Sequence, residues 1–147
     1  MTLARLGLDC RIYYNAGAFN APAWVLIPHV KDLSIGLTTG EADVSTRGTG
    51  GWRAIAQTLK ELSIEFKIQA VIGDNTFNAL RLTWFERDSI DVLVLDDERT
   101  AAGAQGLRAV CQCVDFSREE PLEEGVTYNV VLKATLVTPP VWTIIAN

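Results

Sequence analysis

Two long segments of the chain alternate between apolar and polar residues, which predicts two half-buried β-strands. The first is LSIEFKIQAVI, Leu62–Ile72, and the second is VTYNVVLKATLVT, Val126–Thr138. A period of two places the apolar side chains on one face of a sheet and the polar ones on the other. Each segment is about twice the usual strand length of five or six residues. We therefore expect a large antiparallel sheet, or one that continues across subunits.

Shorter apolar runs, separated by turn residues, predict five further strands. They are Cys10–Tyr14, Trp24–Ile27, Val30–Leu37, Ile90–Leu95 and Leu107–Phe116. The segment Arg53–Glu61 fits either a short helix or a loop.

One helix is predicted over Asn75–Arg87, with Asp74 suited to be its N-cap. Its apolar stripe, at helical spacing, consists of Phe77, Leu80, Trp84 and Phe85. The whole pattern predicts a mainly β fold, a β-sandwich or barrel forming a single domain over 1–147, with the helix packed on its flank. Residues 38–52 are expected to form an extended inter-strand loop or arm, and 139–147 a C-terminal extension.

Composition narrows the class of protein. The 147 residues are 48% hydrophobic and 21% charged, as in an ordinary globular domain. The formal net charge is −5 and the pI is about 4.8, which argues against a basic surface that binds nucleic acid. No apolar run resembles a signal peptide or a membrane span. Three cysteines, a small and odd number, suggest a reducing compartment.

Candidate residues for catalysis or metal binding are few. The one histidine, His29, has no nucleophile–base arrangement near it in the sequence, so a structural or surface role is favoured. Together with His29, the three cysteines could supply four zinc ligands. Their spacing matches no common zinc module, and buried, inert thiols at Cys111 and Cys113 are the favoured interpretation. We predict no catalytic residue, no metal and no cofactor.

The stretch LTTGEADVSTRGTGGW, residues 37–52, is rich in glycine and threonine and ends in Trp52. It contains neither GxxxxGK[ST] nor GxGxxG, so a phosphate-binding loop is a poor interpretation. A flexible linker fits the glycines but would leave a large indole in water. The third interpretation is a segment that orders against a partner.

The order of motifs resembles that of bacteriophage tail tube (major tail) proteins. The motifs are DLSI at 32–35, EADVSTR at 41–47, GGWR at 50–53 and LKELSIEF at 59–66, followed by the helix and a long final strand. The resemblance covers roughly residues 24–138. Residues 1–20 carry little of the pattern, and the apolar ending PPVWTII at 139–145 departs from it.

This resemblance implies a structural subunit, not an enzyme, whose β-sandwich or barrel closes into rings, expected to be hexameric. The rings would stack into a hollow tube in a virion tail assembled in the host cytoplasm, and DNA would pass through without specific binding. The implied partners are other copies of the chain, a tape measure protein, tail-tip or baseplate proteins, a tail terminator and, where the tail is contractile, a sheath protein.

The resemblance also selects candidate residues. The loop would reach a neighbouring subunit or ring, and its interface candidates are Glu41, Asp43, Thr46, Arg47 and Trp52. Its charges could form intersubunit ion pairs, and Trp52 could be an apolar anchor, with local core packing as the alternative. The candidates for the lumen are polar residues of the two long strands, Glu65, Lys67, Gln69, Asn129 and Lys133. A plain solvated face is the alternative for these, whereas a lumen of negative potential would repel phosphates.

A second hypothesis is a soluble β-sandwich module that binds a ligand or partner. Three tryptophans, Trp24, Trp52 and Trp142, lie at or beyond the expected strand ends, where exposed aromatic rings could stack on a ligand. A small hydrolase is the weakest hypothesis, because it rests only on scattered carboxylates and His29.

Overall fold

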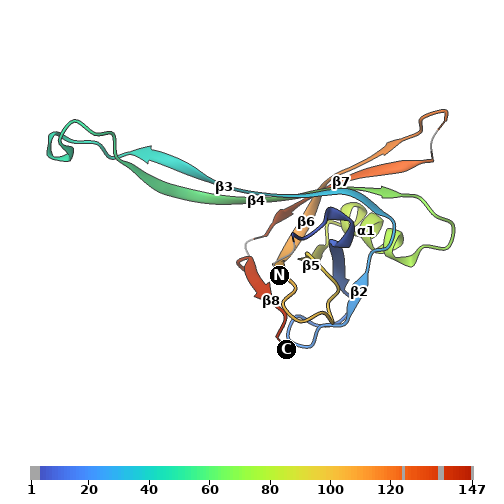
Figure 1. Ribbon diagram of the computed structural model, residues 1–147. Coiled ribbons are helices and arrows are strands. Elements are labelled where there is room, and N and C mark those ends of the chain that lie inside the picture. Colours follow the sequence, from blue (N-terminus) through green and yellow to red (C-terminus); the bar gives the residue numbers. More distant parts are fainter. Residues whose placement is uncertain (1–3, 124, 136–137, 147) are drawn as a thin grey trace.

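The computed structural model describes residues 4–123, 125–135 and 138–146, and Figure 1 shows its course. Two 3₁₀ turns, Gly7–Asp9 and Arg47–Thr49, accompany the regular elements. Those elements are β1 (Arg11–Asn15), β2 (Trp24–Leu26), β3 (Val30–Asp43), β4 (Ile55–Gln69), α1 (Asn75–Phe85), β5 (Ser89–Leu95), β6 (Gln105–Glu119), β7 (Thr127–Ala134) and β8 (Val141–Ile144).

All the strands belong to one antiparallel sheet with the order β2-β1-β5-β6-β7-β4-β3, and β8 pairs with β6. The long strand β6 connects two halves of this sheet. Its residues 106–112 pair with β5, whereas 111–119 pair with β7, and a register shift separates Cys113 from Asp115. The second half, β6-β7-β4-β3, therefore turns away from the first and closes over it, as expected of a sandwich or barrel (Figure 1).

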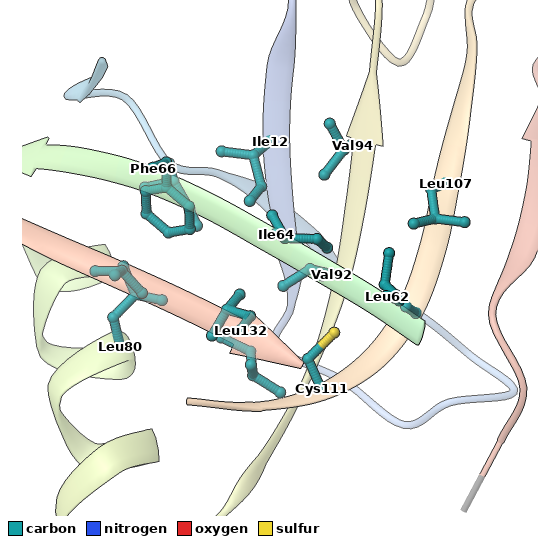
Figure 2. Packing of buried hydrophobic residues seen from close by; sticks show 14 of the residues in the cluster. Ile12, Leu62, Ile64, Phe66, Leu80, Val92, Val94, Leu107, Cys111 and Leu132 are labelled. Carbon is teal, nitrogen blue, oxygen red and sulfur yellow. The ribbon is translucent and has the colours of Figure 1, made fainter. Parts of the chain in front are cut away.

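The core lies between these two halves. Figure 2 shows Ile64 of β4 and Leu132 of β7, which are direct cross-strand partners, packed near Val92 of β5 and Cys111 of β6. The buried cluster comprises Ile12, Ile27, Leu62, Ile64, Phe66, Ile68, Leu80, Ile90, Val92, Val94, Leu107, Ala109, Cys111, Val130 and Leu132. The apolar positions that alternation predicted in 62–68 and 130–132 are thus buried, and the mainly β fold is confirmed.

The helix α1 packs against β6 and β5 and begins where the sequence predicts. The Asp74 carboxylate accepts a hydrogen bond from the Thr76 backbone N–H at 3.0 Å, which caps the first turn. The predicted apolar stripe is only partly right. Leu80 is fully buried, but Trp84 is 44% and Phe85 65% exposed. At 3.6 residues per turn, Phe85 lies about 140° around the helix from Leu80, so both cannot face the core.

The largest correction concerns residues 38–61. Of the expected loop 38–52, residues 38–43 belong to β3 and 47–49 form a 3₁₀ turn, whereas the expected helix or loop Arg53–Glu61 belongs to β4 from Ile55 onward. Strands β3 and β4 pair along their length, from Val30↔Ile68 to Asp43↔Ile55, and form an arm that projects beyond the body (Figure 1). We call residues 37–61 the arm and residues 44–54 the arm tip. Cross-strand hydrogen bonds satisfy the backbone there even though no core lies against it.

Two irregularities interrupt the β3–β4 pairing. The first lies between Lys31 and Ser34, where Asp32 has a φ of 51°. The second lies between Thr39 and Glu41, opposite an extra residue in β4. A Cβ at Gly40 would collide with the Thr58 hydroxyl, so a larger residue there would require the Thr58 side chain to rotate away.

The remaining boundaries differ modestly from prediction. Strand β6 extends beyond the predicted Leu107–Phe116 at both ends, and the long strands end at Gln69 and Ala134. Leu136, predicted to continue the last alternation, lies outside the described residues. In the expected extension 139–147, Val141–Ile144 forms β8 on the edge of β6, so this segment adds to the sheet.

We expect Ile64→Ala to lower the free energy of unfolding of the monomer by about 2–5 kcal/mol, because it leaves a cavity where the side chain is fully buried. Urea titration followed by circular dichroism measures the change. The matched control is Leu59→Ala on the same strand, where the side chain is exposed and we expect about 0.5 kcal/mol or less. Equal losses for the two variants would contradict the assignment of the core.

Candidate assembly surfaces

The structure brings the five lumen candidates together on one face of the sheet. Lys67 lies directly opposite Asn129, Glu65 opposite Val131, and Ser63 opposite Lys133. In an antiparallel pair, directly opposed residues point to the same side. Because their neighbours Ile64, Phe66 and Ile68 point into the core, this face is the outer side of the β4–β7 pair.

The same face extends over β3 and β6. We call it the polar sheet face. It comprises Lys31, Ser34 and Thr38 of β3, Glu61, Ser63, Glu65, Lys67 and Gln69 of β4, Thr127, Asn129, Val131 and Lys133 of β7, and Asp115, Ser117 and Glu119 of β6. Sequence reasoning missed the contribution of β6, because the register shift after Cys113 breaks the two-residue period. The alternation of Asp115, Ser117 and Glu119 was the available signal.

Charges on the polar sheet face are mixed and partly paired. Lys133 Nζ lies 3.1 Å from Glu61 Oε1, and Asn129 Nδ2 donates to Glu119 Oε1 at 2.8 Å. Lys31 and Lys67 lie directly opposite each other, which places two like charges side by side. The four carboxylates outnumber the three ammonium groups by one, so this is not the basic surface that grips a phosphate backbone.

This four-stranded part of the sheet has two open edges within the described residues. Strand β3 pairs only with β4, and residues 113–119 of β6 pair only with β7. Every neighbouring pair is antiparallel, so β6 and β3 run in opposite directions. An open β3 edge is therefore suited to antiparallel pairing with the open β6 edge of another copy.

The arm tip is held by its own hydrogen bonds. The Thr46 hydroxyl accepts from the Gly48 N–H at 3.2 Å, and the Trp52 N–H donates to the Thr49 carbonyl at 3.2 Å. Gly50 and Gly51 have φ values of 66° and 84°, a region that favours glycine. The arm tip is therefore a structured turn, in which glycines occupy the positions with positive φ and threonines supply the hydrogen bonds.

All five interface candidates are exposed at or near this tip. Trp52 is 81% exposed, which excludes local core packing as its role. Asp43 accepts hydrogen bonds from Ser45, which lower the pKa of its carboxyl below the usual value. Within the described part of the chain, no ion pair involves Glu41, Asp43 or Arg47. Their charges remain accessible to another molecule.

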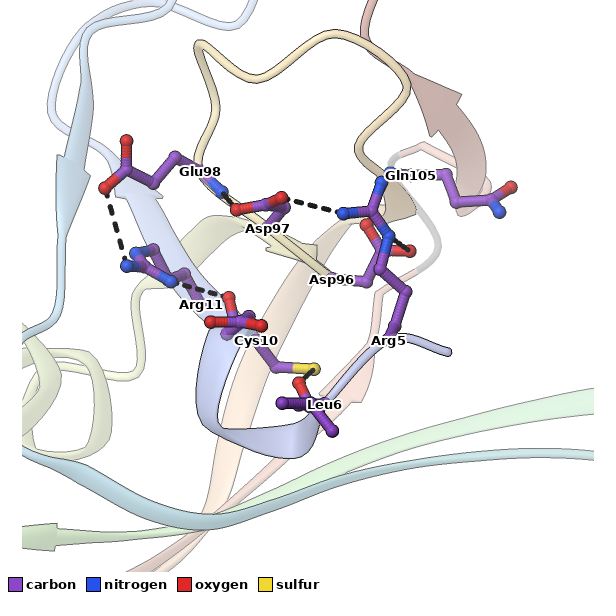
Figure 3. A network of polar contacts seen from close by, with 9 residues as sticks. Arg5, Leu6, Cys10, Arg11, Asp96, Asp97, Glu98 and Gln105 are labelled. Carbon is purple, nitrogen blue, oxygen red and sulfur yellow. Dashed lines mark hydrogen bonds and ion pairs between the residues drawn. The ribbon is translucent and has the colours of Figure 1, made fainter. Parts of the chain in front are cut away.

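The three acidic residues that follow β5, Asp96, Asp97 and Glu98, have basic partners near the N-terminus. Figure 3 shows Arg5 bound to Asp97 at 2.7 Å and to Asp96 at 3.5 Å, and Arg11 bound to Glu98 at 3.4 Å. These ion pairs fasten the N-terminal segment to the loop after β5. Among the described residues, no three His, Cys, Asp or Glu side chains gather as a metal site would require.

The tryptophans of the ligand-binding hypothesis lie on separate elements. Trp24 packs against the Arg108 guanidinium, whose carbon lies 5.0 Å from the ring centroid, and Arg108 in turn binds Asp91 at 2.7 Å. Trp142 on β8 donates to Gln105 Oε1 at 3.2 Å. Trp52 lies at the arm tip.

The described helix is too short and too polar to cross a membrane.

The fold is an antiparallel β-sandwich with one flanking helix, a long projecting hairpin and an open polar sheet. No protein-family profile and no curated protein matches the sequence. Solved structures do match the fold. A chain from the tail of an empty gene transfer agent particle, refined with C6 symmetry, has a TM-score of 0.72 at 16% identity, covering 97% of this chain and 100% of that one.

Two further structures extend this similarity. A chain of the SPP1 tail tube has a TM-score of 0.74 at 13% identity and covers 98% of this chain and 81% of that one. A chain from the anti-feeding prophage baseplate has a TM-score of 0.65 at 8% identity, with 99% of both chains covered. The chain therefore has the fold seen in tail tube proteins of phages and gene transfer agents, as the sequence predicted.

At pH 8 we expect Cys10 alone to react rapidly with Ellman's reagent in the native protein, because it is exposed. Burial raises the pKa of Cys111 to about 12 and that of Cys113 to about 11, so their thiolate fraction is very small. Unfolding in urea should release both. Fast reaction of any thiol in the native Cys10→Ser variant, which keeps only Cys111 and Cys113, would contradict this assignment.

The raised pKa values of Cys111 and Cys113 also predict how the stability of the fold changes with pH. The folded state favours the protonated thiols, so their contribution is fully present below the unfolded-state pKa of about 9. The free energy of unfolding should fall as the pH rises from about 9 toward 12.

Proposed function

We propose that this chain is the structural subunit of a phage-type tail tube, without catalytic activity, and that it closes into hexameric rings. The observation that carries the proposal is the polar sheet face, a four-stranded antiparallel layer with an open edge at each side. Pairing β3 of one copy with the open part of β6 in the next would continue the layer around a closed ring. Closure removes both edges.

Simple geometry supports a channel wide enough for a DNA duplex. A tail with this fold has C6 symmetry, and six copies with four strands each would give a barrel of 24 strands. With a strand spacing of about 4.8 Å and a tilt of about 40°, such a barrel is about 48 Å across at the backbone. Side chains standing about 5 Å off each wall leave a lumen wider than a DNA duplex.

The mixed charge of the polar sheet face suits a conduit. A DNA duplex binds strongly only where several phosphates are neutralised together. On this face Glu61, Glu65, Asp115 and Glu119 lie among the three lysines, so a passing duplex would meet no continuous basic track. We assign DNA the role of a passenger, and place the subunit in a virion tail assembled in the host cytoplasm.

The arm gives the ring a means of growing into a tube. Its exposed Trp52 and charged residues project beyond the body and are positioned to contact a neighbouring copy (Figure 1). The ends of the resulting tube would bind a terminator on one side and tail-tip or baseplate proteins on the other. The lumen would hold a tape measure protein, and the outer face would bind a sheath if the tail contracts.

Electron microscopy of the purified protein tests this function. We expect rings or tubes with an axial channel at high protein concentration. In a matched variant, an Asn-Gly turn replaces residues 39–60 and joins the cross-strand partners Thr38 and Glu61. This variant keeps the whole core, so it should fold with a similar melting temperature yet form no tubes. Normal tubes without the arm, or a strictly monomeric wild-type protein, would contradict the proposal.

Thiol labelling tests which face lines the channel. In a Cys10→Ser background, we expect Asn129→Cys to react with a small maleimide in both free and assembled protein. Its reaction with a maleimide on a long polyethylene glycol chain should fall about tenfold or more on assembly, because the channel excludes the polymer. The control is Thr100→Cys, an exposed position outside the polar sheet face. Equal polymer labelling at both positions in tubes would overturn the assignment.

A further inference from the structure

The long strands carry unlike surfaces at their two ends. At one end is the arm tip, residues 44–54. At the other end lie the connections after β4 and between β6 and β7, because Gln69 pairs with Thr127 and Thr127 with Glu119. We call Val71, Ile72, Glu120, Leu122 and Glu123 the turn end. Figure 1 shows these connections on the side of the body away from the arm tip.

The turn end exposes large apolar side chains. Ile72 and Leu122 are fully exposed, and Val71 is 42% exposed. A single exposed Ile or Leu needs no explanation, but here they occur on two connections at one end of the sheet. The arm tip has the same character, since Trp52 and its neighbours Val44 and Ile55 are exposed. Both ends therefore leave apolar surface uncovered in a single copy.

The charges at the two ends are complementary. The arm tip contains Arg47 and Arg53 and no acidic residue, and no ion pair within the described residues involves either arginine. Asp43 accepts a hydrogen bond from the Ser45 backbone N–H and keeps its negative charge, but it lies at the base of the arm and not in the tip.

The turn end is acidic by comparison. Glu120 and Glu123 lie there, next to Glu119 at the end of β6, and the exposed pair of Arg118 with Glu120 at 2.7 Å offsets only one of these charges. Each copy therefore has a basic tip with an exposed indole at one end of its long strands and an acidic end with exposed aliphatic side chains at the other.

We propose that the arm tip of one copy binds the turn end of a copy in the adjacent ring, which rests on the proposed tube function and names its stacking contact. Strand β4 has 15 residues, so the two surfaces are about 48 Å apart in one copy and cannot meet within it. In a head-to-tail stack, opposite ends of identical subunits meet at every interface. Trp52 then packs on Leu122 and Ile72, while Arg47 and Arg53 approach Glu120 and Glu123.

Charge reversal tests this contact. We expect the Arg47→Glu/Arg53→Glu variant, and separately the Glu120→Lys/Glu123→Lys variant, to form rings but to reduce the yield of tubes by about tenfold or more. Combining all four substitutions in one chain restores opposite charges at every interface, so tubes should return. Electron microscopy measures tube yield, and native mass spectrometry measures the rings. The matched controls reverse exposed charges on α1 and at its C-cap, Arg81→Glu and Glu86→Lys, and should assemble like wild type.

The outcomes separate this contact from the tube function itself. If wild type forms tubes and both charge-reversed variants form them equally well, the contact is wrong and the proposed function stands. If the two variants fail but the fourfold variant fails as well while still forming rings, the pairing of these two surfaces is also overturned. If wild type forms neither rings nor tubes, the proposed function and this contact fall together.

Discussion

The structure depends on one constraint, which is that β6 pairs along different parts of its length with different halves of the sheet. Its first part is bound to β5 and its second part to β7, with a register shift between them. A bulge of this kind bends and twists the strand. That bend allows one continuous sheet to enclose its own core, so that Ile64 and Leu132 from one half meet Val92 from the other.

The same arrangement leaves the second half of the sheet open at both sides. Where β6 leaves β5, its far edge has no strand partner among the described residues, and β3 ends the sheet at the other side. The core and the open polar sheet face are therefore consequences of one backbone path. The core needs only the inward face of β4 and β7, which leaves their outward face free to be polar.

Alternation predicted those strands that have one buried and one wet face. Ile64, Ile68 and Leu132 repeat every two residues because the core imposes that period. The arm has no core on either face, so its sequence carries no such period, and its strands exist because β3 and β4 satisfy each other's backbone groups. Pairing between distant residues leaves no local signal, which is why 38–52 was predicted to be a loop and Arg53–Glu61 a short helix or a loop.

The candidate surfaces show the same division. Glu65, Lys67, Gln69, Asn129 and Lys133 could be selected because they alternate with core residues, and the structure places them on one face. The members from β3 and β6 were missed because each strand contains a bulge that changes which side its residues face. The prediction that Trp84 and Phe85 share the buried stripe of the helix failed for another reason. Helical spacing alone cannot tell which part of a wide apolar stripe meets the core.

The bulge at Asp32 has a consequence for how the β3 edge behaves in a single copy of the chain. An unpaired β3 edge is a template on which any exposed strand can add, so a single copy risks aggregation. The bulge divides that edge into a short run before Asp32 and a longer run after it, and puts a charged residue at the break. A strand with an uninterrupted register cannot match both runs together. The bulge therefore disfavours chance pairing of the β3 edge with regular strands. It still allows pairing with a strand whose shape matches both runs.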